Sequence, residues 1–357
     1  MGKGPLIRCR VPLRVSLAGG GTDVSPFVED HGGVALSLAL DRFVTCTVET
    51  TDDDSVELKS ADYGISTRFA PGTIPLFDGN LDLIKGVLRR VQPSWHVGLK
   101  MWLTSDAPPG SGLGASSALV VSAILGLCRC LDVAITPAST AALAYIVERV
   151  DLGITGGYQD QYAAAFGGVS WMEFSGSGVR VSRPPVSDAV LDELNEHVLL
   201  WYTGEVHLSA GILEEQVANY VQRRPGSEGL FEIKRLAYRM LASLEVGDIR
   251  SVGRLLHNSW QVKRSLASSI TSPAIDALYD AGLHAGALGG KLLGAGGGGY
   301  LLFIVPPEQK RDVMSALRHL GGTDAGRVRL GADTPKTWTA EFGRGAEVFD
   351  VSPRGRA

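Results

Sequence analysis

The stretch Pro108-Pro109-Gly110-Ser111-Gly112-Leu113-Gly114-Ala115-Ser116-Ser117-Ala118 lies between a strand-like segment, 99–105, and an apolar segment with helical character, 118–131. Three glycines at alternate positions allow the backbone to turn tightly and to approach a ligand closely. Consecutive N–H groups and the N-terminus of the following helix can then point at an anion. The stretch therefore predicts a phosphate-binding loop.

Other readings of this loop are weaker but remain open on the loop alone. A glycine-rich turn can merely cap a helix. No lysine follows the last glycine as in a Walker loop, and Gly110, Gly112 and Gly114 are spaced as GxGxG rather than as the GxGxxG of dinucleotide-binding proteins. The run from Gly114 to Ala118 lacks the second glycine of a hydrolase nucleophile elbow. The phosphate interpretation therefore depends on the other glycine-rich turns of the chain.

The composition is that of a globular enzyme. The 357 residues are 45% hydrophobic and 20% charged, and this length favours two domains. The 45 glycines are nearly twice the usual share of about 7%, which predicts many turns and loops. A net charge of −4 gives no long-range attraction to nucleic acid or to an anionic membrane surface, so we expect neither as a partner.

The cysteines and the hydropathy pattern indicate a cytoplasmic protein. Four cysteines with apolar neighbours and no C-x-x-C pair predict buried thiols in a reducing compartment, at Cys9, Cys46, Cys128 and Cys130. The first ten residues contain no apolar run of signal-peptide length. The longest apolar run, 119–127, is too short to span a bilayer.

Hydrophobic periodicity predicts two halves, each with strands and helices. In the first half we expect strands at 8–16, 34–40, 42–50, 168–174 and 179–181 and helices at 81–91 and 138–149. In the second half we expect strands at 197–202, 300–305 and 327–330 and helices at 230–244, 249–265, 272–285 and 308–320. The polar, proline-containing segment 182–192 separates the halves. We predict domains at 1–188 and 189–338 and a loosely ordered tail at 339–357.

Three glycine-rich turns follow one another along the chain, at Gly19–Asp23, Pro108–Ser117 and Gly294–Gly299. They resemble the three signature motifs of the GHMP kinases, the small-molecule kinases named for galactose, homoserine, mevalonate and phosphomevalonate. The resemblance extends over most of the chain, from the region of Arg8 to that of Leu330. Two stretches, 12–23 and 151–162, look most like the bacterial heptose 7-phosphate kinases.

The resemblance implies a fold, a reaction and two cofactors. The fold is α+β with two domains, an N-terminal one like domain 2 of ribosomal protein S5 and a ferredoxin-like C-terminal one, with the site in the cleft between them. The reaction is transfer of the ATP γ-phosphoryl group, with Mg²⁺, to a hydroxyl of a small-molecule sugar or sugar phosphate. The oligomeric state is left open.

The phosphate loop and one glutamate are the expected nucleotide and metal site. The predicted nucleotide-binding residues are Pro109, Gly110, Ser111, Gly112, Leu113, Gly114, Ala115, Ser116 and Ser117. Ser117 and Glu148 are the predicted Mg²⁺ ligands, and Glu148 lies twelve residues before Asp160, close to the spacing of mevalonate-type kinases. One carboxylate with one hydroxyl suffices because phosphate and water oxygens complete the shell of Mg²⁺. The alternative for Glu148 is a surface glutamate paired with Arg149.

Asp160 and Arg14 are the predicted catalytic residues. Asp160 stands where the family carries its catalytic aspartate, and it would accept or orient the proton of the attacking hydroxyl. Arg14 matches the arginine of the first motif, and its planar guanidinium suits both anchoring that aspartate and stabilising negative charge. An unpaired arginine in an apolar strand is costly, so we expect the two side chains to be coupled. Whether Asp160 is a true base or an electrostatic group stays open.

Asp23 and several glycines of the other turns are predicted to bind the acceptor sugar. Asp23 matches a position at which sugar kinases bind substrate hydroxyls, and Gly20-Gly21 replace the Glu-His of galactokinases, which disfavours galactose. The predicted substrate-binding residues are Gly20, Gly21, Thr22, Asp23, Gly156, Gly157, Gly296 and Gly297. A plain tight turn is an equally good reading of Gly156-Gly157. A phosphorylated acceptor also needs a basic group, for which Lys85, Lys263 and Arg264 are candidates, each with a solvated surface position as its alternative.

We therefore predict an ATP-dependent kinase of the anomeric hydroxyl of a sugar, a heptose 7-phosphate. One alternative is an anomeric kinase of an unphosphorylated sugar such as fucose or a uronic acid. A second is a catalytically silent sugar sensor, which the presence of both Asp160 and Glu148 disfavours. A nicotinamide-dependent oxidoreductase is disfavoured because no acidic residue follows a proper glycine fingerprint at about twenty residues.

Overall fold

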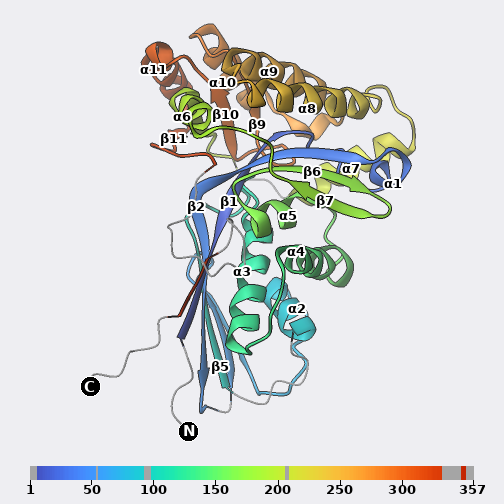
Figure 1. The fold of residues 1–357 in the computed structure, drawn as a ribbon, viewed down its shortest axis with the longest axis vertical. Coiled ribbons are helices and arrows are strands. Elements are labelled where there is room, and N and C mark those ends of the chain that lie inside the picture. Colours follow the sequence, from blue (N-terminus) through green and yellow to red (C-terminus); the bar gives the residue numbers. More distant parts are fainter. Residues whose placement is uncertain (1–5, 54, 92–97, 206–208, 332–346, 351–357) are drawn as a thin grey trace.

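Two β-sheets organise the molecule, and helices pack against both (Figure 1). The computed structural model describes residues 6–53, 55–91, 98–205, 209–331 and 347–350. The larger sheet has eight strands and belongs mainly to the first half of the chain, and the smaller sheet has four strands from the second half. These two sheets agree with the two-part α+β architecture expected from the sequence.

The larger sheet is built on a long antiparallel pair, β1 and β2. Along β1 the apolar residues Val11, Leu13, Val15 and Leu17 alternate, and every residue from Val11 to Ala18 is buried, so both faces of this part of the strand are covered. The strand order is β12-β1-β2-β5-β3-β4, and β6 also pairs with β2 and with β7. The strands are β1 (Leu6–Ala18), β2 (Gly33–Thr51), β3 (Val56–Ser60), β4 (Ile65–Phe69), β5 (Gly98–Ser105), β6 (Val169–Ser175), β7 (Gly178–Ser182) and β12 (Glu347–Asp350).

One helix, α3, forms the centre of the first half. It is apolar on most of its surface and packs against β1 and β2 as well as against three neighbouring helices. A helix that is apolar all round is stable only when it is covered on all sides. The helices of this half are α1 (Phe27–His31), α2 (Asp82–Val91), α3 (Ala115–Cys130), α4 (Pro137–Tyr145), a π-helical turn (Ile146–Asp151) and α5 (Gln159–Phe166).

The smaller sheet has the order β11-β8-β10-β9, all antiparallel. Its strands are β8 (Val198–Tyr202), β9 (Gly289–Leu292), β10 (Tyr300–Ile304) and β11 (Thr323–Asp324). The helices are α6 (Asp188–His197), α7 (Ser209–Val221), α8 (Gly229–Glu245), α9 (Ile249–Arg264), α10 (Pro273–His284) and α11 (Lys310–Leu320), with 3₁₀ turns at Ser268–Ile270 and Pro307–Gln309. Helix α9 lies on β9 and β10, whereas α8 also contacts β1 and β2, so one hydrophobic core runs through both halves.

Several element predictions are wrong, each for a local reason. Segments 34–40 and 42–50 form one strand, β2, because Asp41 stays in the strand by bonding the backbone of Arg329. Helix α3 begins at Ala115 rather than at 118, since Gly114 takes the left-handed conformation (φ 74°) that ends the loop. The expected helix 138–149 changes to a π-helical turn at Ile146.

Three further corrections concern the chain after the first half. The boundary segment 182–192 contains the start of a helix that was not predicted from the sequence, because Ser187 caps α6, whose first residue is Asp188. The strand expected at 327–330 is reduced to an isolated bridge between Leu330 and Leu40. Within the expected loose tail, 347–350 form β12 on the edge of β1, while the rest of 339–357 lies outside the described residues. The domain boundaries at 188 and 338 stay a prediction.

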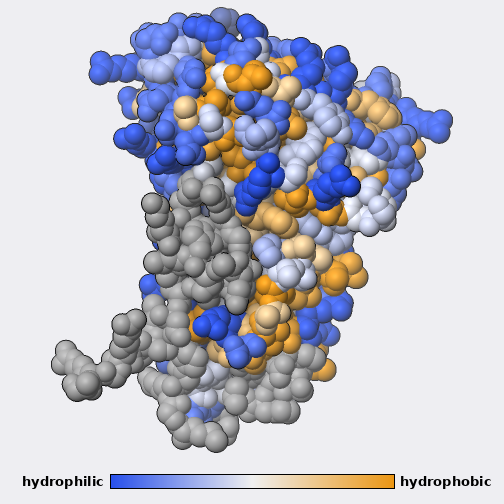
Figure 2. Space-filling model, in the orientation of Figure 1, coloured by the Kyte–Doolittle hydropathy of each residue, from blue (hydrophilic) through white to orange (hydrophobic). Residues whose placement is uncertain are grey.

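The face of the molecule in Figure 2 carries hydrophilic residues over its upper end, where α8 to α11 lie in Figure 1, with apolar residues interspersed. Large exposed apolar side chains belong to several separate elements and include Tyr63, Leu76, Val133 and Val246. No helix in the described parts of the chain is long and apolar enough to cross a membrane.

Candidate functional site

The two glycine-rich loops, 108–117 and 294–299, touch each other through their backbones. A Cβ on Gly112 would lie 2.5 Å from the carbonyl oxygen of Leu293, and one on Gly294 would lie 2.7 Å from the Cα atom of Gly112. Both residues also have positive φ, at 78° and 75°. Only glycine therefore allows this approach, which brings the phosphate loop of the first half against the last glycine turn of the second.

The phosphate loop leads directly into α3, as its sequence predicts. Gly110, Gly112 and Gly114 all have φ between 73° and 78°. Ser116 and Ser117 follow in the first turn of α3, at the end of the helix that attracts anions. The Ser111 hydroxyl is buried and has no hydrogen-bond partner among the residues that the structure describes. An unsatisfied hydroxyl inside a glycine loop fits a site that receives phosphate oxygens.

The predicted coupling of Arg14 and Asp160 is present in the structure. The Arg14 Nε and Nη2 atoms lie 2.8 Å and 2.7 Å from Asp160 Oδ1, and Nη1 donates to the carbonyl of Gly112 at 2.6 Å. Arg14 is 4% exposed on β1, whereas the Asp160 side chain, in the first turn of α5, is 26% exposed. Arg14 therefore joins the carboxylate of Asp160 to the phosphate loop.

Glu148 is buried, which rules out the alternative of a surface glutamate. It lies in the π-helical turn, and Ser116 and Ser117 each donate a hydroxyl to one of its carboxylate oxygens at 2.7 Å. The Gln161 amide also donates to it, and the nearest guanidinium, that of Arg149, is 3.8 Å away. Local π turns recur at functional sites. This one directs the carboxylate at the first turn of α3.

Asp23 is completely buried and is already held by neutral donors. Its oxygens accept hydrogen bonds from the backbone N–H groups of Gly21 and Gln159, both at 3.0 Å, and from the Gln159 amide at 3.2 Å. A Cβ on Gly157 would overlap its Oδ2 atom. Burial raises the pKa of this carboxyl above its ordinary value. In the structure Asp23 thus binds the start of α5, next to Asp160.

The other predicted acceptor residues occupy the same region in different ways. Thr22 is buried and its hydroxyl bonds the backbone of Gly19 and Val34, so it joins the glycine turn to β2. Gly156 lies against the guanidinium of Arg149. Gly296 and Gly297 pack on the backbone of Ile270. Gly20 is next to Ser16 and Gln159, and Gly21 accepts a hydrogen bond from Gln216 at 3.4 Å.

The three basic residues proposed to bind an acceptor phosphate have different partners in the structure. Lys85 bonds two carboxylates near the start of α2, Asp78 at 2.5 Å and Asp82 at 3.4 Å. Arg264 pairs with Asp276 at 2.9 Å. Lys263 is buried at the end of α9, where its Nζ donates to the carbonyl of Gly294 at 2.5 Å. Its charge interacts with those of Arg14, Asp23 and Asp160, so it belongs to the site.

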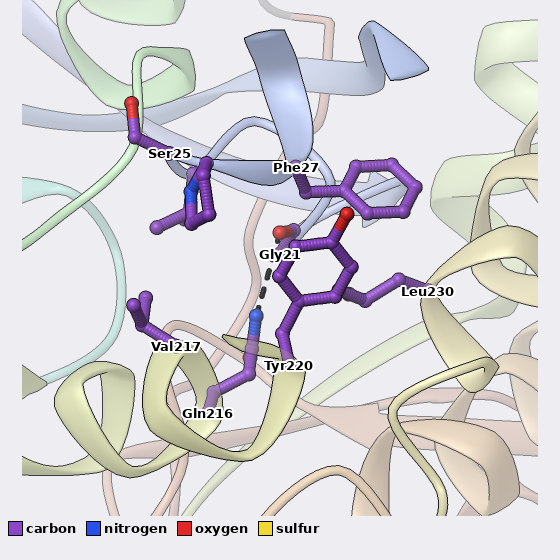
Figure 3. Close-up of a pocket in the computed structure, with 9 residues that line it drawn as sticks. Gly21, Ser25, Phe27, Gln216, Val217, Tyr220 and Leu230 are labelled. Carbon is purple, nitrogen blue, oxygen red and sulfur yellow. Dashed lines mark hydrogen bonds between the residues drawn. The ribbon is translucent and has the colours of Figure 1, made fainter. Parts of the chain in front are cut away.

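A small hollow opens beside the first glycine turn (Figure 3). Gln216 of α7 points at Gly21 from one side, and the rings of Phe27 and Tyr220 lie near it. Its lining carries no charged side chain and consists of Gly21, Val24, Ser25, Pro26, Phe27, Gln216, Val217, Tyr220 and Leu230. Such a lining suits hydroxyl groups and apolar faces, not a phosphate.

Sequence reasoning missed four residues that the fold brings to this site: Ser16, Gln159, Gln161 and Lys291. Gln159 and Gln161 flank Asp160, and this Gln-Asp-Gln pattern was a signal that both amides turn inward at the start of α5. Ser16 donates to the Gln159 amide oxygen at 2.7 Å. Lys291 lies in a buried strand next to the last glycine turn. Because burying a charge is costly, a lysine in such a strand could have been identified from the sequence as a candidate functional residue.

Two family models match the chain. The N-terminal domain model of the GHMP kinases matches residues 82–168, which include the phosphate loop, Glu148 and Asp160. The C-terminal domain model of the same kinases matches residues 240–322, which include Lys263 and the last glycine turn. The two-domain fold expected from the sequence is thereby confirmed.

Similar proteins include sugar kinases that match most of this chain. The D-glycero-alpha-D-manno-heptose 7-phosphate kinase of Campylobacter jejuni is 32% identical over 87% of this chain and 93% of its own. The L-fucokinase/L-fucose-1-P guanylyltransferase of Bacteroides fragilis is 28% identical over 84% of this chain but 34% of its own. A solved D-glycero-D-manno-heptose 1-phosphate kinase from Bacteroides thetaiotaomicron is 31% identical with a TM-score of 0.77, covering 97% of this chain and all of the other. The chain therefore belongs to the GHMP kinase family and is an ATP-dependent sugar kinase.

Proposed function

We propose that this kinase transfers the γ-phosphoryl group of ATP, with Mg²⁺, to the anomeric C1 hydroxyl of a heptose 7-phosphate and forms the 1,7-bisphosphate. The observation that carries the proposal is the Arg14–Asp160 pair, which lies against the phosphate loop and leaves one carboxylate oxygen for an acceptor. The similarity to heptose phosphate kinases supports the choice of sugar.

Asp160 is the group that would receive the proton of the acceptor. Arg14 occupies Oδ1, and no residue within the described ranges donates to Oδ2, so Oδ2 can accept a hydrogen bond from the C1 hydroxyl. The C1 oxygen then forms a bond to the γ-phosphorus while the bond from that phosphorus to the β–γ bridging oxygen breaks. The hydroxyl proton passes to Asp160, and ADP leaves with the bridging oxygen. Arg14 holds the carboxylate in this orientation and adds positive charge beside the transferring group.

The phosphate loop would hold the nucleotide without side-chain charge. Its three glycines have left-handed backbone conformations, and the loop ends at the N-terminus of α3, a helix of 16 residues. Backbone N–H groups in such a turn, together with the helix dipole, bind phosphate oxygens. Ser111 and Ser116 add hydroxyl groups to this cradle, and the Ser111 hydroxyl is otherwise unsatisfied.

The residues around Glu148 fit a divalent cation. Its carboxylate is 1% exposed and bonded to three neutral donors, while the closest cationic atom is at 3.8 Å. The ion pair with Arg149 at 3.8 Å is long and compensates the buried carboxylate only in part. The two serine hydroxyls can rotate and present oxygen instead of hydrogen. The Gln161 Oε1 atom is also buried and unpartnered within the described chain. Glu148 and Ser117 would hold Mg²⁺, which when bound supplies positive charge to the nucleotide phosphates.

The acceptor sugar would lie between Asp160 and the hollow beside Gly21. That hollow is too small for a sugar ring and would form only the edge of the acceptor site, with Gln216 as a polar group and Phe27 and Tyr220 as aromatic ones. Glycine at position 21 adds no side chain to this edge. The uncharged lining means that a phosphate on the acceptor needs its cationic partner elsewhere in the site.

The test is an ADP-release assay with Mg²⁺ and ATP across a panel of acceptors. The panel contains D-glycero-D-manno-heptose 7-phosphate, mannose, fucose, galactose, glucuronic acid and mevalonate, and phosphorus NMR assigns the phosphorylated position. We expect turnover on the heptose phosphate with a new phosphate at C1. Turnover on fucose or another free sugar, with none on the heptose phosphate, would show that the proposed substrate is wrong.

The same assay tests the catalytic assignment. Asp160→Asn keeps the shape of the side chain but cannot accept the proton, so we expect kcat to fall by about 10²–10⁴-fold. Asp192→Asn is the control, because Asp192 also pairs with an arginine, Arg329, but on the exposed surface. Equal activity of the two variants would remove Asp160 from the mechanism.

A further inference from the structure

Two buried lysines of the site have no carboxylate partner among the residues that the structure describes. Lys263 on α9 is 6% exposed and Lys291 on β9 is 3% exposed. The Nζ atom of Lys263 donates to the carbonyl of Gly294 at 2.5 Å, and that of Lys291 donates to the carbonyl of Ser16 at 3.0 Å. Neither makes an ion pair with any carboxylate in the described ranges. Each ammonium group has three N–H donors, so most of its capacity is unused.

The local charge balance is positive. Burial lowers the pKa of both lysines, and the charge of Arg14 and, for Lys291, that of Lys263 lower it further. The pKa of Lys263 falls to about 8 although Asp23 and Asp160 oppose the change. Asp160 is already bonded to Arg14, and Asp23 to backbone and amide donors. Lys263 thus lies near two carboxylates that have other partners, and Lys291 lies near the cations Lys263 and Arg14. A bound anion would stabilise this arrangement.

The two ammonium groups lie where the loops of the site meet. Ser16 follows Arg14 by two positions on β1, and Gly294 begins the turn that packs on Gly112 of the phosphate loop. The carbonyls of Gly112 and Gly294 accept from Arg14 and Lys263 respectively, so one cation is attached to each loop. An anion that reaches these loops therefore approaches both Arg14 and Lys263.

We propose that Lys263 and Lys291 form a binding site for a phosphoryl dianion, separate from the backbone cradle of the phosphate loop. The ligand is either the terminal phosphate of the nucleotide or the phosphate that the acceptor sugar carries. The second source rests on the proposed heptose 7-phosphate function, whereas the first needs only the kinase activity. The two ammonium groups, each with unused N–H donors, match the two negative charges of a phosphoryl dianion.

Calorimetric titration distinguishes the two sources. The proteins are the wild type, Lys263→Met, Lys291→Met and the matched control Lys85→Met, whose lysine is equally buried but paired with Asp78 and Asp82. The ligands are Mg²⁺ with ADP, Mg²⁺ with the non-hydrolysable analogue AMP-PNP, D-glycero-D-manno-heptose 7-phosphate, and mannose. Losing a charge-assisted hydrogen bond weakens binding by about tenfold or more.

For the nucleotide source we expect the methionine variants at 263 and 291 to lose at least about tenfold in affinity for AMP-PNP and to bind ADP like the wild type. For the acceptor source we expect the same loss for the heptose phosphate only. If the wild type does not bind the heptose phosphate while AMP-PNP shows the loss, the lysine site stands and the proposed substrate fails. Unchanged affinities for both phosphorylated ligands would overturn the site.

Proton uptake gives an independent readout that does not require the methionine variants to fold. An anion that docks on Lys263 raises its pKa, so near pH 8.5 the wild-type complex should take up a proton, seen as a binding enthalpy that depends on the buffer. Lys263→Arg keeps the charge but remains protonated, and we expect this uptake to disappear. The same uptake in wild type and Lys263→Arg, or none in either, contradicts the proposal.

Discussion

Lys85 and Lys263 show two opposite ways of burying a lysine in one protein. Both are almost fully buried, at 2% and 6% exposure. Lys85, on α2, contacts two carboxylates, Asp78 and Asp82, which remain 53% and 21% exposed. Lys263, on α9, donates a hydrogen bond to the carbonyl of Gly294, pairs with no carboxylate of the described residues, and shares its surroundings with the cations Arg14 and Lys291. The charge of Lys85 is therefore neutralised by carboxylates of the chain, whereas that of Lys263 has no such partner in the described ranges.

The difference between these two lysines shows how an unpaired buried charge can indicate a ligand site. A buried charge that the chain neutralises itself can be explained by structure. A buried charge that the chain leaves without a counter-charge, beside two glycine loops that carry backbone N–H groups, is explained by an anion from outside. Four expected outcomes test this distinction.

The largest expected effect is on catalysis. Lys263→Met should lower kcat/KM by about 100-fold, because a charge-assisted contact with the phosphoryl group is lost in a site screened from water. Lys85→Met, which removes a buried lysine far from the glycine loops in sequence, should stay within about twofold of the wild type. Steady-state kinetics with saturating ATP measures both. Equal losses in the two variants would mean that Lys263 has only a structural role.

The second effect is on stability, and its sign differs between the two lysines. Lys85→Met removes the cation that Asp78 and Asp82 contact and should lower the free energy of unfolding, but only modestly because both carboxylates are partly exposed. Lys263→Met removes an uncompensated buried charge and should raise it by about 1–3 kcal/mol at pH 7. Chemical denaturation of the ligand-free protein gives both values. A clear loss of stability in Lys263→Met would show that its charge is neutralised after all.

The third effect is the pH dependence of stability. Because the pKa of Lys263 is lowered from 10.5 to about 8, the unfolded chain binds a proton between these values that the folded protein does not. The free energy of unfolding should therefore rise with pH in this window, by at most about 1.4 kcal/mol per pH unit from this group. Lys263→Met should lose this contribution, and Lys85→Met should keep it. Thermal melts at pH 8, 9 and 10 provide the comparison.

The smallest effect concerns a partner of Lys85. The contact with Lys85 lowers the pKa of Asp78, so its stabilising contribution is present above the ordinary value of 3.8 and is lost as the pH falls through the lowered value. Asp78 is largely exposed, and exposed ion pairs contribute little. Asp78→Asn should thus change the melting temperature only slightly at pH 7, and this change should shrink as the pH falls below 3.8. A large shift at pH 7 would mean that this pair is screened from solvent.

The three glycine-rich turns were enough to predict the family and the fold, whereas the roles of the site residues stay a prediction. Their backbone demands are local: Gly110, Gly112 and Gly114 have positive φ, and Gly112 also tolerates a backbone contact that any Cβ would prevent. Arg14 and Asp160 were paired from the cost of burying an unpartnered arginine. Errors arose where neighbours outweigh local pattern, as at Asp41 within β2 and at α6, which begins just after a proline-rich segment.

The sequence by itself determined the family, the sharply turning glycine loop before α3, and the residue types available for phosphoryl transfer, because these depend on backbone conformation and on chemistry carried by short motifs. It offered no reason to prefer one of Lys85, Lys263 and Arg264, since the charge of a side chain in a sequence says nothing of what lies near it. Only the tertiary structure decided that Asp78 and Asp276 neutralise two of them, that Lys291 joins the third, and that Glu148 is buried with the Arg149 guanidinium 3.8 Å away. Electrostatic partners come from residues far apart in the chain, and the fold alone brings them together.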